Sequence, residues 1–454
     1  MWSGCPWIPF RDKWEPRPFI SALRPESAGF SIAFFDTAEG AKEHILHWRR
    51  RFSDIWSEMR TSAGTAHVTG LYDYAEYELY ISAPDGRRST LRLVRTGAPL
   101  GDVVNYLHPD DTAFGFSGRY FGSPSIVRLP SGILLAAYDL FCSGFPMCLM
   151  QIFASTDNGK TWEYRCDLLP AQWGKLFVHH GRLYMLAVSR EYGDLLIGES
   201  KDEGRTWENP TVIGRGLGNG RSGFHRAPCP YALCGGRIWF AVENGSWSES
   251  EDGFDDMLVS APEEAVLTDA ESWTFTRPAK YKPSWRGEKS GTLIEGNPFI
   301  GADGELYVLY RCAANDAVLM RADAAEPSRM LEFAGRVMFP PALSKFEIVR
   351  LEDGTLVAVG NEPYEDGRWR RNVLSMYRSE NGKEWDKACR LIDASAFDRE
   401  YTGFQYPGLL LENDALTVIS RTAWNGAHTY HDSNMVTIHR FELNGPQRGA
   451  DKAD

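Results

Sequence analysis

Four residues have side chains suited to acid–base or nucleophilic chemistry: Asp139, His225, Glu295 and Tyr406. Each stands at the edge of an apolar run that reads as a β-strand. Cleavage of a glycoside requires a pair of carboxyl groups, or a tyrosine activated by a neighbouring glutamate. A histidine or tyrosine base beside a neutralised uronate would instead support β-elimination. These residues predict acid–base chemistry, and they leave glycoside hydrolysis and β-elimination open.

A second set of side chains at similar strand ends could hold a substrate. Arg226, Arg311, Lys345 and Arg421 can bind a carboxylate, the arginines through a two-pronged contact. His431 follows Arg421 in a segment that reads either as a binding loop or as a turn rich in Asx residues. The other predicted substrate-binding residues are Lys175, Glu243, Asn297 and Gln405. This set favours a ligand that carries a carboxylate.

The elements that must position these residues form a repeat. Six times the chain shows an apolar strand, a short turn with Gly or Asn-Asp, and a second apolar strand. The hairpins are residues 125–138, 176–188, 231–242, 298–310, 346–359 and 407–420. Their spacing of roughly 50 to 70 residues, with about four strands per unit, is typical of β-propeller blades. We expect six blades, with a strand near residues 112–118 completing the last. A seventh blade built from N-terminal strands is the alternative.

Propeller geometry explains why the candidate residues should meet. In each blade the innermost strand and its neighbour are antiparallel, so the start of the first and the end of the second emerge on one face. Every predicted blade has polar or ionisable residues at those positions. We therefore predict a polar cup around the axis. For any single residue, a solvated or capping role is the alternative.

An eight-residue turn motif, Ser-x-Asp-x-Gly-x-x-Trp, occurs at residues 155–162 and 200–207. Looser copies stand at residues 379–385 and 268–273. Ser and Asp can close a turn, Gly supplies a left-handed position, and Trp packs the hairpin against its sheet. The motif is predicted to be scaffold that joins outer strands, away from the cup.

Composition narrows the class of protein. The 454 residues include 43 glycines and 25 prolines, which suits a turn-rich β protein. A net charge of −12 argues against nucleic acid or an anionic membrane as the main partner. The eight cysteines show no metal-ligand spacing, so no metal or cofactor is required; calcium in the central channel is an alternative that nothing in the spacing demands. No signal peptide is recognised, so a cytoplasmic location is expected.

Residues 1–110 are expected to form a smaller α+β domain with its linker, before a propeller at 111–446 and a flexible tail at 447–454. The helical spacing of apolar residues within 36–59 predicts a helix. Strands around it resemble a fibronectin-type sandwich. Residues 96–118, rich in Gly and Pro, are predicted to be the linker.

From residue 119 to 443 the chain resembles the sialidase superfamily, whose bacterial BNR-repeat members carry these turn motifs, called Asp boxes. The segments that carry the resemblance are the Asp boxes and residues 123–126, 173–177, 295–297, 371–372, 404–406, 421–423 and 431–434. The pattern is nearer the rhamnosyl-glucuronate lyases and hydrolases than true sialidases. The resemblance implies an all-β, six-bladed sialidase-like propeller that acts on carbohydrate.

Two departures separate the chain from those relatives. True sialidases open the first blade with Arg-Ile-Pro, whose Arg joins a triad on the sialate carboxylate; here residues 120–124 lack it. The rhamnosyl-glucuronate branch is expected to have His where this chain has Tyr138. We therefore expect an exo-acting glycosidase for a terminal, acidic sugar of an oligosaccharide. A uronate lyase and a non-catalytic glycan-binding propeller are the alternatives.

Overall fold

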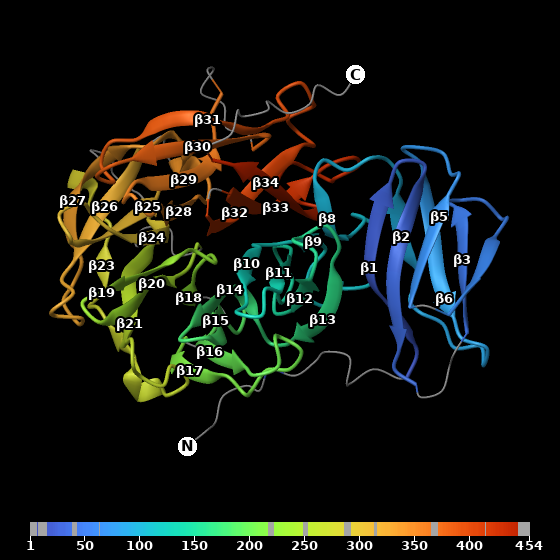
Figure 1. Ribbon diagram of the computed structural model, residues 1–454, viewed down its shortest axis with the longest axis horizontal. Coiled ribbons are helices and arrows are strands. Elements are labelled where there is room, and N and C mark those ends of the chain that lie inside the picture. The colour runs from blue at the N-terminus through green and yellow to red at the C-terminus, as the bar shows by residue number, and fades with distance from the viewer. Residues whose placement is uncertain are drawn as a thin grey trace.

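The chain folds into two β-bodies, a sandwich and a larger ring of sheets, which lie side by side in Figure 1. Helix among the described residues is limited to three short 3₁₀ turns, η2 (Ala270–Ser272), η3 (Pro283–Trp285) and η4 (Pro340–Leu343). The prediction of an all-β protein is confirmed. The computed structural model describes residues 7, 16–38, 43–62, 64–216, 222–247, 253–285, 292–312, 316–364, 371–413 and 415–443.

The N-terminal sandwich has one sheet of three strands and one of four. The first sheet contains β1 (Pro18–Glu26), β2 (Gly29–Asp36) and β5 (Thr65–Thr69). The second contains β4 (Ser57–Thr61), β3 (His44–Arg50), β6 (Glu76–Ser82) and β7 (Arg92–Arg95). Buried and half-buried side chains alternate along β6, as expected where one face of a sheet covers a core.

The predicted helix within residues 36–59 is wrong. Residues 44–50 and 57–61 form β3 and β4, which pair with each other, and β3 also pairs with β6. Phe52 and Ile55, which the helical reading placed on its apolar stripe, are 86% and 79% exposed. Hydrogen-bonding partners on both edges of β3 override the helical spacing. The N-terminal domain is therefore β rather than α+β in its described residues.

Each of the six predicted hairpins lies in its own antiparallel sheet, and the sheets follow one another around an axis (Figure 1). The first three sheets contain β9 (Tyr120–Phe121), β10 (Ser125–Arg128), β11 (Leu134–Phe141), β12 (Met150–Ser155) and β13 (Glu163–Leu168); β14 (Gln172–His179), β15 (Arg182–Val188), β16 (Leu195–Ser200) and β17 (Thr211–Gly214); and β18 (Gly223–His225), β19 (Tyr231–Cys234), β20 (Arg237–Gly245), β21 (Phe254–Pro262), β22 (Thr274–Phe275) and β23 (Ala279–Lys280).

The remaining sheets contain β24 (Ile294–Ile300), β25 (Leu306–Arg311), β26 (Asp316–Ala322) and β27 (Glu332–Met338); β28 (Glu347–Arg350), β29 (Leu356–Asn361), β30 (Val373–Ser379) and β31 (Asp386–Asp393); and β32 (Gly403–Glu412), β33 (Ala415–Ala423), β34 (Met435–Glu442) and β8 (Asp102–Tyr106). The innermost strand β10 contacts both β14 and β32, so the first and last sheets meet. This arrangement is a β-propeller.

The strand that completes the last sheet is β8, which pairs with β34 in antiparallel register. The prediction that this strand lies near residues 112–118 is wrong, and β8 lies inside the segment 96–118 that is predicted to be a linker. Residues 112–118 instead form turns, held by bonds such as Gly115 N to Thr112 O at 3.0 Å. The short apolar run Val103–Val104 inside a Gly-rich and Pro-rich region concealed the strand. The predicted tail at 447–454 lies outside the described residues.

The turn at residues 155–162 is closed by its own side chains. Gly159 N donates to Ser155 Oγ at 2.8 Å, and Thr161 N donates to Asp157 Oδ1 at 2.9 Å. The Trp162 indole N–H reaches Gly159 O at 2.9 Å. The turn joins β12 to β13, the outer strands of the first sheet, and its twin at 200–207 joins β16 to β17. Both are outer connections of their sheets.

Candidate active site

A cup of about 440 Å³ opens at one end of the propeller axis. Its lining comes mainly from starts of innermost strands and ends of their neighbours, as the repeat predicted. The lining residues are Ser123, Phe141, Ser143, Met147, Trp173, Glu191, Tyr192, His225, Arg226, Ala227, Trp247, Glu295, Arg311, Arg371, Tyr406, Arg421 and His431. Seven of them, His225, Arg226, Glu295, Arg311, Tyr406, Arg421 and His431, were selected from the sequence as site residues.

Glu295, Arg311 and Tyr406 form a connected group in the cup. Arg311 Nη1 donates to Glu295 Oε2 at 2.7 Å and to the Tyr406 hydroxyl oxygen at 3.3 Å. Burial would raise the pKa of Glu295, but Arg311 and the Tyr406 hydroxyl outweigh it and lower that pKa. These surroundings favour the ionised form of Glu295, which lies beside the Tyr406 hydroxyl.

A shared backbone feature aims three lining residues at the cup. Trp173, Glu295 and Tyr406 have φ of 50°, 57° and 53°, and each lies at a register shift in an innermost strand, β14, β24 or β32. Bulges with left-handed residues turn side chains out of their ordinary strand direction. Such strained positions persist at functional sites when the surrounding structure holds them. Three such positions at one end of the channel make the cup the candidate site.

Two further guanidinium groups flank the Tyr406 ring. The Arg421 guanidinium carbon lies 4.1 Å from the ring centroid, and that of Arg371 lies 5.4 Å away. Burial, together with the charges of Arg311 and Arg421, lowers the pKa of Arg371 to about 9, although Tyr406 opposes this. The guanidinium groups of Arg311, Arg371 and Arg421 therefore gather around Tyr406, an arrangement that suits the binding of an anionic ligand.

Gln405 holds the arginines rather than lining the cup, and its side chain is fully buried. Its Oε1 accepts from both Arg371 and Arg421. Its Nε2 donates to Ser433 Oγ at 3.0 Å and to the carbonyl oxygen of His431 at 3.0 Å. The predicted substrate-binding role of Gln405 is therefore replaced by a positioning role in this structure.

The other side of the cup is aromatic. The His225 ring contacts Trp173 at 4.6 Å and Phe254 at 4.8 Å between centroids, and Trp247 stands 6.0 Å away. His225 Nδ1 lies 3.4 Å from Glu243 Oε2, and Glu243 is fully buried behind it. Trp247 is 53% exposed at the rim. This wall suits the apolar face of a sugar ring.

Arg226 also lines the cup, at the side of the third sheet. Its Nη1 donates to the Leu186 carbonyl oxygen, and burial lowers its pKa to about 10. It is 1% exposed, so only a part of its guanidinium edge is presented to a ligand.

His431 lies at the rim, and its Nδ1 is 3.0 Å from Asp432 Oδ1. Burial, with the charge of Arg421, lowers its pKa to about 4, so the imidazole is neutral near pH 7. The segment after Arg421 thus contributes to the cup, in agreement with the binding-loop reading.

Three predicted site residues are buried behind the cup. Asp139 is fully buried, accepts from Ser123 N at 3.0 Å and Gln172 Nε2 at 2.9 Å, and has its pKa raised to about 7 by burial. Asn297 is fully buried and caps backbone groups, including Ile348 N at 3.0 Å. Glu243 backs His225. None of these three lines the cup.

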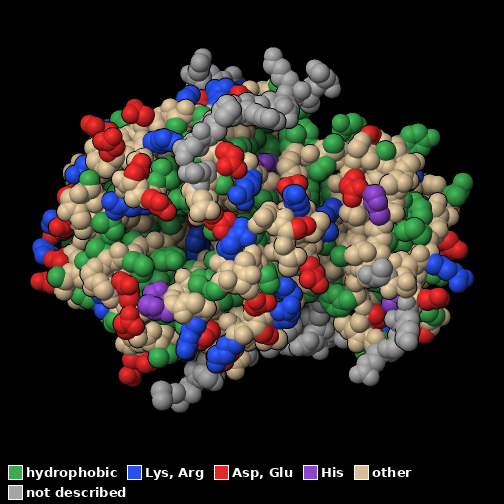
Figure 2. Space-filling view, in the orientation of Figure 1, with side chains coloured by type: hydrophobic (Ala, Val, Ile, Leu, Met, Phe, Trp, Pro, Cys, Tyr) green, Lys and Arg blue, Asp and Glu red, His purple; other side chains and the backbone are tan. Residues whose placement is uncertain are grey.

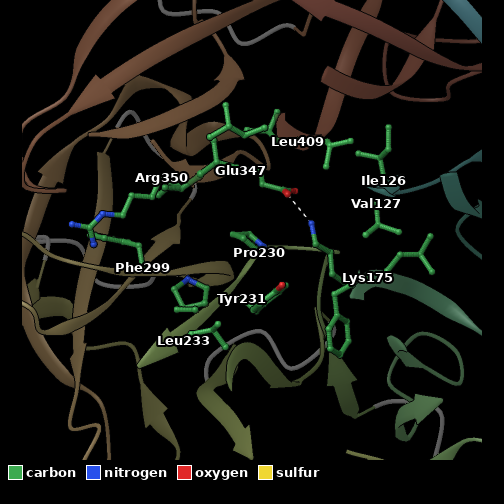
Figure 3. A pocket seen from close by; sticks show the side chains of 18 of the residues that line it. Ile126, Val127, Lys175, Pro230, Tyr231, Leu233, Phe299, Glu347, Arg350 and Leu409 are labelled. Carbon is green, nitrogen blue, oxygen red and sulfur yellow. Dashed lines mark hydrogen bonds and ion pairs between the residues drawn. The ribbon is translucent and has the colours of Figure 1, made fainter. Parts of the chain in front are cut away.

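Lys175 and Lys345 lie below the cup, contrary to the prediction that they bind substrate there. Lys175 Nζ and Lys345 Nζ each contact a different oxygen of Glu347, both at 2.7 Å. Figure 3 shows the Lys175–Glu347 pair inside a separate apolar cavity, beside Ile126, Leu409 and Tyr231. Residues near the start of one strand can therefore reach different places: Trp173 lines the cup, whereas Lys175 contacts Glu347 in this charged core.

The sequence did not select several lining residues. Glu191 and Trp247 are absent from the predicted site residues, and Arg371 and Trp173 enter the sequence analysis only within the segments that carry the family resemblance. A usable signal for Glu191 is its position just after β15, because Arg311 stands at the corresponding end of β25.

No group of three or more His, Cys, Asp or Glu side chains that could hold a metal ion occurs in the described part of the chain. Within those same ranges, no helix is long and apolar enough to cross a membrane. Acidic and basic side chains are interspersed over the face shown in Figure 2.

A protein family described as BNR repeat-like domain matches residues 176–419, more than half of the chain. The chain therefore belongs to this family. The turn motifs at residues 200–207 and 379–385 lie within the matched range. The comparison with curated proteins finds no match.

Solved structures of low sequence identity share the fold. An α-L-arabinanase from Penicillium chrysogenum, complexed with arabinobiose, is 16% identical, with a TM-score of 0.51 over 76% of this chain and 99% of that one. An intramolecular trans-sialidase from Ruminococcus gnavus, in complex with oseltamivir carboxylate, is 12% identical, with a TM-score of 0.51 over 76% and 99%. A leech intramolecular trans-sialidase complexed with 2,7-anhydro-Neu5Ac is 9% identical, with a TM-score of 0.51 over 96% and 93%. The resemblance to sialidase-like propellers is confirmed.

Proposed function

We propose that the protein is a glycoside hydrolase that removes a terminal acidic sugar from an oligosaccharide. The observation that carries the proposal is the contact of Glu295, Arg311 and Tyr406 inside a buried cluster of arginines. Glycosidases of related fold with a tyrosine nucleophile are a recognised exception to the two-carboxylate rule. Enzymes named in the structural comparisons act on or bind sugars, which agrees with this proposal.

In the proposed reaction the carboxylate of the terminal sugar lies against Arg311, Arg371 and Arg421. Arginine suits this task because its fork matches both oxygens of a carboxylate. The arrangement would place the anomeric carbon beside the Tyr406 hydroxyl, whose proton passes to Glu295. Arg311, which contacts both oxygens, would then stabilise the charge that develops between them.

The aromatic side of the cup is proposed to receive the rest of the oligosaccharide. Trp247, exposed at the rim, and Trp173 would contact the neighbouring sugar. The cup volume of about 440 Å³ lies within the range of small-molecule sites and favours a short, terminal portion of the substrate. An exo-acting enzyme fits this size.

The test is a screen of oligosaccharides capped by uronate or sialate, with the mass of the product as the readout. Hydrolysis adds one water to the products, whereas elimination gives an unsaturated uronate that lacks it and absorbs in the near ultraviolet. Tyr406→Phe should reduce turnover by about 10²-fold or more, since it removes the hydroxyl that reacts. A folded Tyr406→Phe variant with full activity would refute the proposed chemistry.

Two other outcomes of the screen discriminate the alternatives. An unsaturated product would assign the cup to a uronate lyase. Sugar binding without turnover across the panel would indicate a glycan-binding propeller. Lys387→Ala, which removes an exposed partner of Glu362 far from the cup lining, is the matched control and should leave turnover unchanged.

A further inference from the structure

Only two of the described residues that line the cup carry a carboxyl group, Glu295 and Glu191. Glu295 comes from β24 in the fourth sheet, and Glu191 follows β15 in the second. The third sheet separates their strands, so the two carboxyls enter the cup from different sides of the ring. A glycosidase needs a proton donor for the departing oxygen on the side away from its nucleophile.

The loop that carries Glu191 is held rigidly. Ser189 N donates to Asp194 O at 2.9 Å, and Asp194 N donates to Ser189 Oγ at 3.0 Å. Gly193 O accepts from Phe224 N at 3.1 Å, which ties the loop to β18 of the next sheet. Since His225 follows Phe224 directly, this bridge sets Glu191 beside His225 at the cup wall.

The two cup carboxyls have contrasting surroundings. Glu295 is paired with Arg311 at 2.7 Å, whereas no ion pair reaches Glu191 from any described residue. Burial raises the pKa of Glu191, against weaker opposing effects of His225 and the Tyr192 hydroxyl. When the surroundings lower the pKa of one carboxyl and raise the pKa of another, the first is suited to act as a base and the second as an acid.

We infer that Glu191 is the general acid–base residue of the cup, which protonates the leaving group opposite Tyr406. This assignment rests on the proposed hydrolase function. His225 is a less suitable donor because it is 5% exposed and enclosed by Trp173, Phe254 and Glu243. It acts instead as a positioning residue, through its place next to the Glu191 loop.

The first half of the reaction proceeds with one bond formed and one broken. The Tyr406 oxygen bonds to the anomeric carbon while its proton moves to Glu295. The bond from the anomeric carbon to the leaving oxygen breaks, and its electron pair accepts the proton of Glu191. The result is a glycosyl-tyrosine, a free alcohol, a protonated Glu295 and an ionised Glu191.

The second half restores the enzyme. Glu191 removes a proton from water as the water oxygen bonds to the anomeric carbon. The bond to the Tyr406 oxygen breaks, and Glu295 returns its proton to that oxygen. One water is consumed, and both carboxyls regain their starting states.

The test compares leaving groups. For whichever acidic sugar the wild-type protein releases, kcat/KM is measured with its 4-nitrophenyl glycoside and its methyl glycoside. Glu191→Gln should lose about 10²- to 10⁴-fold on the methyl glycoside, which needs protonation, and about 10-fold or less on the nitrophenyl glycoside. Glu203→Gln, on the outer turn at 200–207, is the matched control and should match wild type on both.

Equal losses on both glycosides, or no loss on either, would overturn the assignment. The same leaving-group pattern in His225→Asn, with Glu191→Gln unaffected, would transfer the role to His225. If the wild-type protein releases no acidic sugar, the proposed function itself fails. Far-ultraviolet circular dichroism and melting temperatures of each variant separate lost chemistry from lost folding.

Discussion

At the scale of single residues, the Glu295 carboxylate and the guanidinium groups of Arg311, Arg371 and Arg421 gather around the Tyr406 phenol on one side of the cup. Arg311 contacts both Glu295 and Tyr406. When a proton moves from Tyr406 to Glu295, the negative charge that moves to the Tyr406 oxygen therefore stays beside the Arg311 guanidinium. Buried arginines are costly unless a partner compensates them. Gln405 Oε1 offsets part of this cost by accepting from Arg371 and Arg421, and a carboxylate ligand would offset more of it.

The pH dependence of kcat/KM follows from the two cup carboxyls. Glu295 must be ionised, and its pKa is lowered from 4.5, so activity should persist to low pH and fall only below that value. Glu191 must be protonated, and its pKa is raised from 4.5, so activity should fall as the pH rises through that higher value. We expect a bell-shaped profile whose basic limb is lost in Glu191→Gln.

Initial rates at fixed ionic strength between pH 3 and 9 would measure this profile. A wild-type profile without a basic limb, or a basic limb that Glu191→Gln leaves in place, would show that another group supplies the proton.

At the scale of elements, the bulges of β14, β24 and β32 position the cup residues. Each turns one residue, Trp173, Glu295 or Tyr406, into a left-handed conformation. Gly174 and Gly296 follow two of these residues, and both are closely packed: a Cβ on Gly296 would lie 2.6 Å from Tyr310 Cε1 and 2.8 Å from Ala241 Cβ. The backbone at the bulge has little room to move.

Gly296→Ala should therefore displace Glu295. We expect kcat/KM to fall about 10-fold or more and the free energy of unfolding to fall by about 1–3 kcal/mol. Steady-state kinetics and urea unfolding of the same sample give both numbers. Gly354→Ala, in the turn between β28 and β29 where φ is 92°, is the control: it should cost stability and leave the activity of the folded protein unchanged. Equal activity losses in both variants would contradict a specific role for the bulge.

Much of the element pattern could be predicted, because hairpins with Gly turns and the Trp-bearing motif at 155–162 are local signals. The register shift at Glu295 could not be predicted, since it depends on how β25 pairs with β24. The helix expected within residues 36–59 failed for a similar reason: β3 becomes a strand because β4 and β6 bond to its two edges. The burial of Lys175 and Lys345 below the cup could not be predicted either. Their positions near strand starts do not show whether the side chains point to the cup or into the core.

At the scale of the whole molecule, the sandwich and the propeller are joined by shared structure. β8 belongs to the last propeller sheet, and Asn105 within it accepts from Leu23 N of β1 at 3.0 Å. Arg92 of β7 pairs with Asp111 at 2.6 Å, and both side chains are almost fully buried. Phe19 of the sandwich packs in the same core cluster as Phe121 of the propeller. The domain boundary therefore does not fall in a free linker.

We expect one thermal unfolding transition for the two bodies. Because β8 completes the propeller and also contacts β1, the sandwich cannot separate without exposing this shared core. Differential scanning calorimetry should show a single peak, and Asp111→Ala should lower its temperature, since it leaves Arg92 buried without its partner at a cost of about 3–5 kcal/mol. Two separate peaks in the wild-type protein would show that the sandwich is an independent unit.

The central claim, that the cup cleaves a glycoside through Tyr406, is tested most directly by trapping the covalent intermediate. A fluorinated acidic sugar with a fluoride leaving group forms the glycosyl-enzyme readily and releases it slowly. Intact mass spectrometry followed by peptide mapping locates the adduct. We predict one sugar per chain on Tyr406, absent in Tyr406→Phe. An adduct on Glu295 would contradict the account. So would the absence of any adduct when the reagent is built on a sugar that the protein does release.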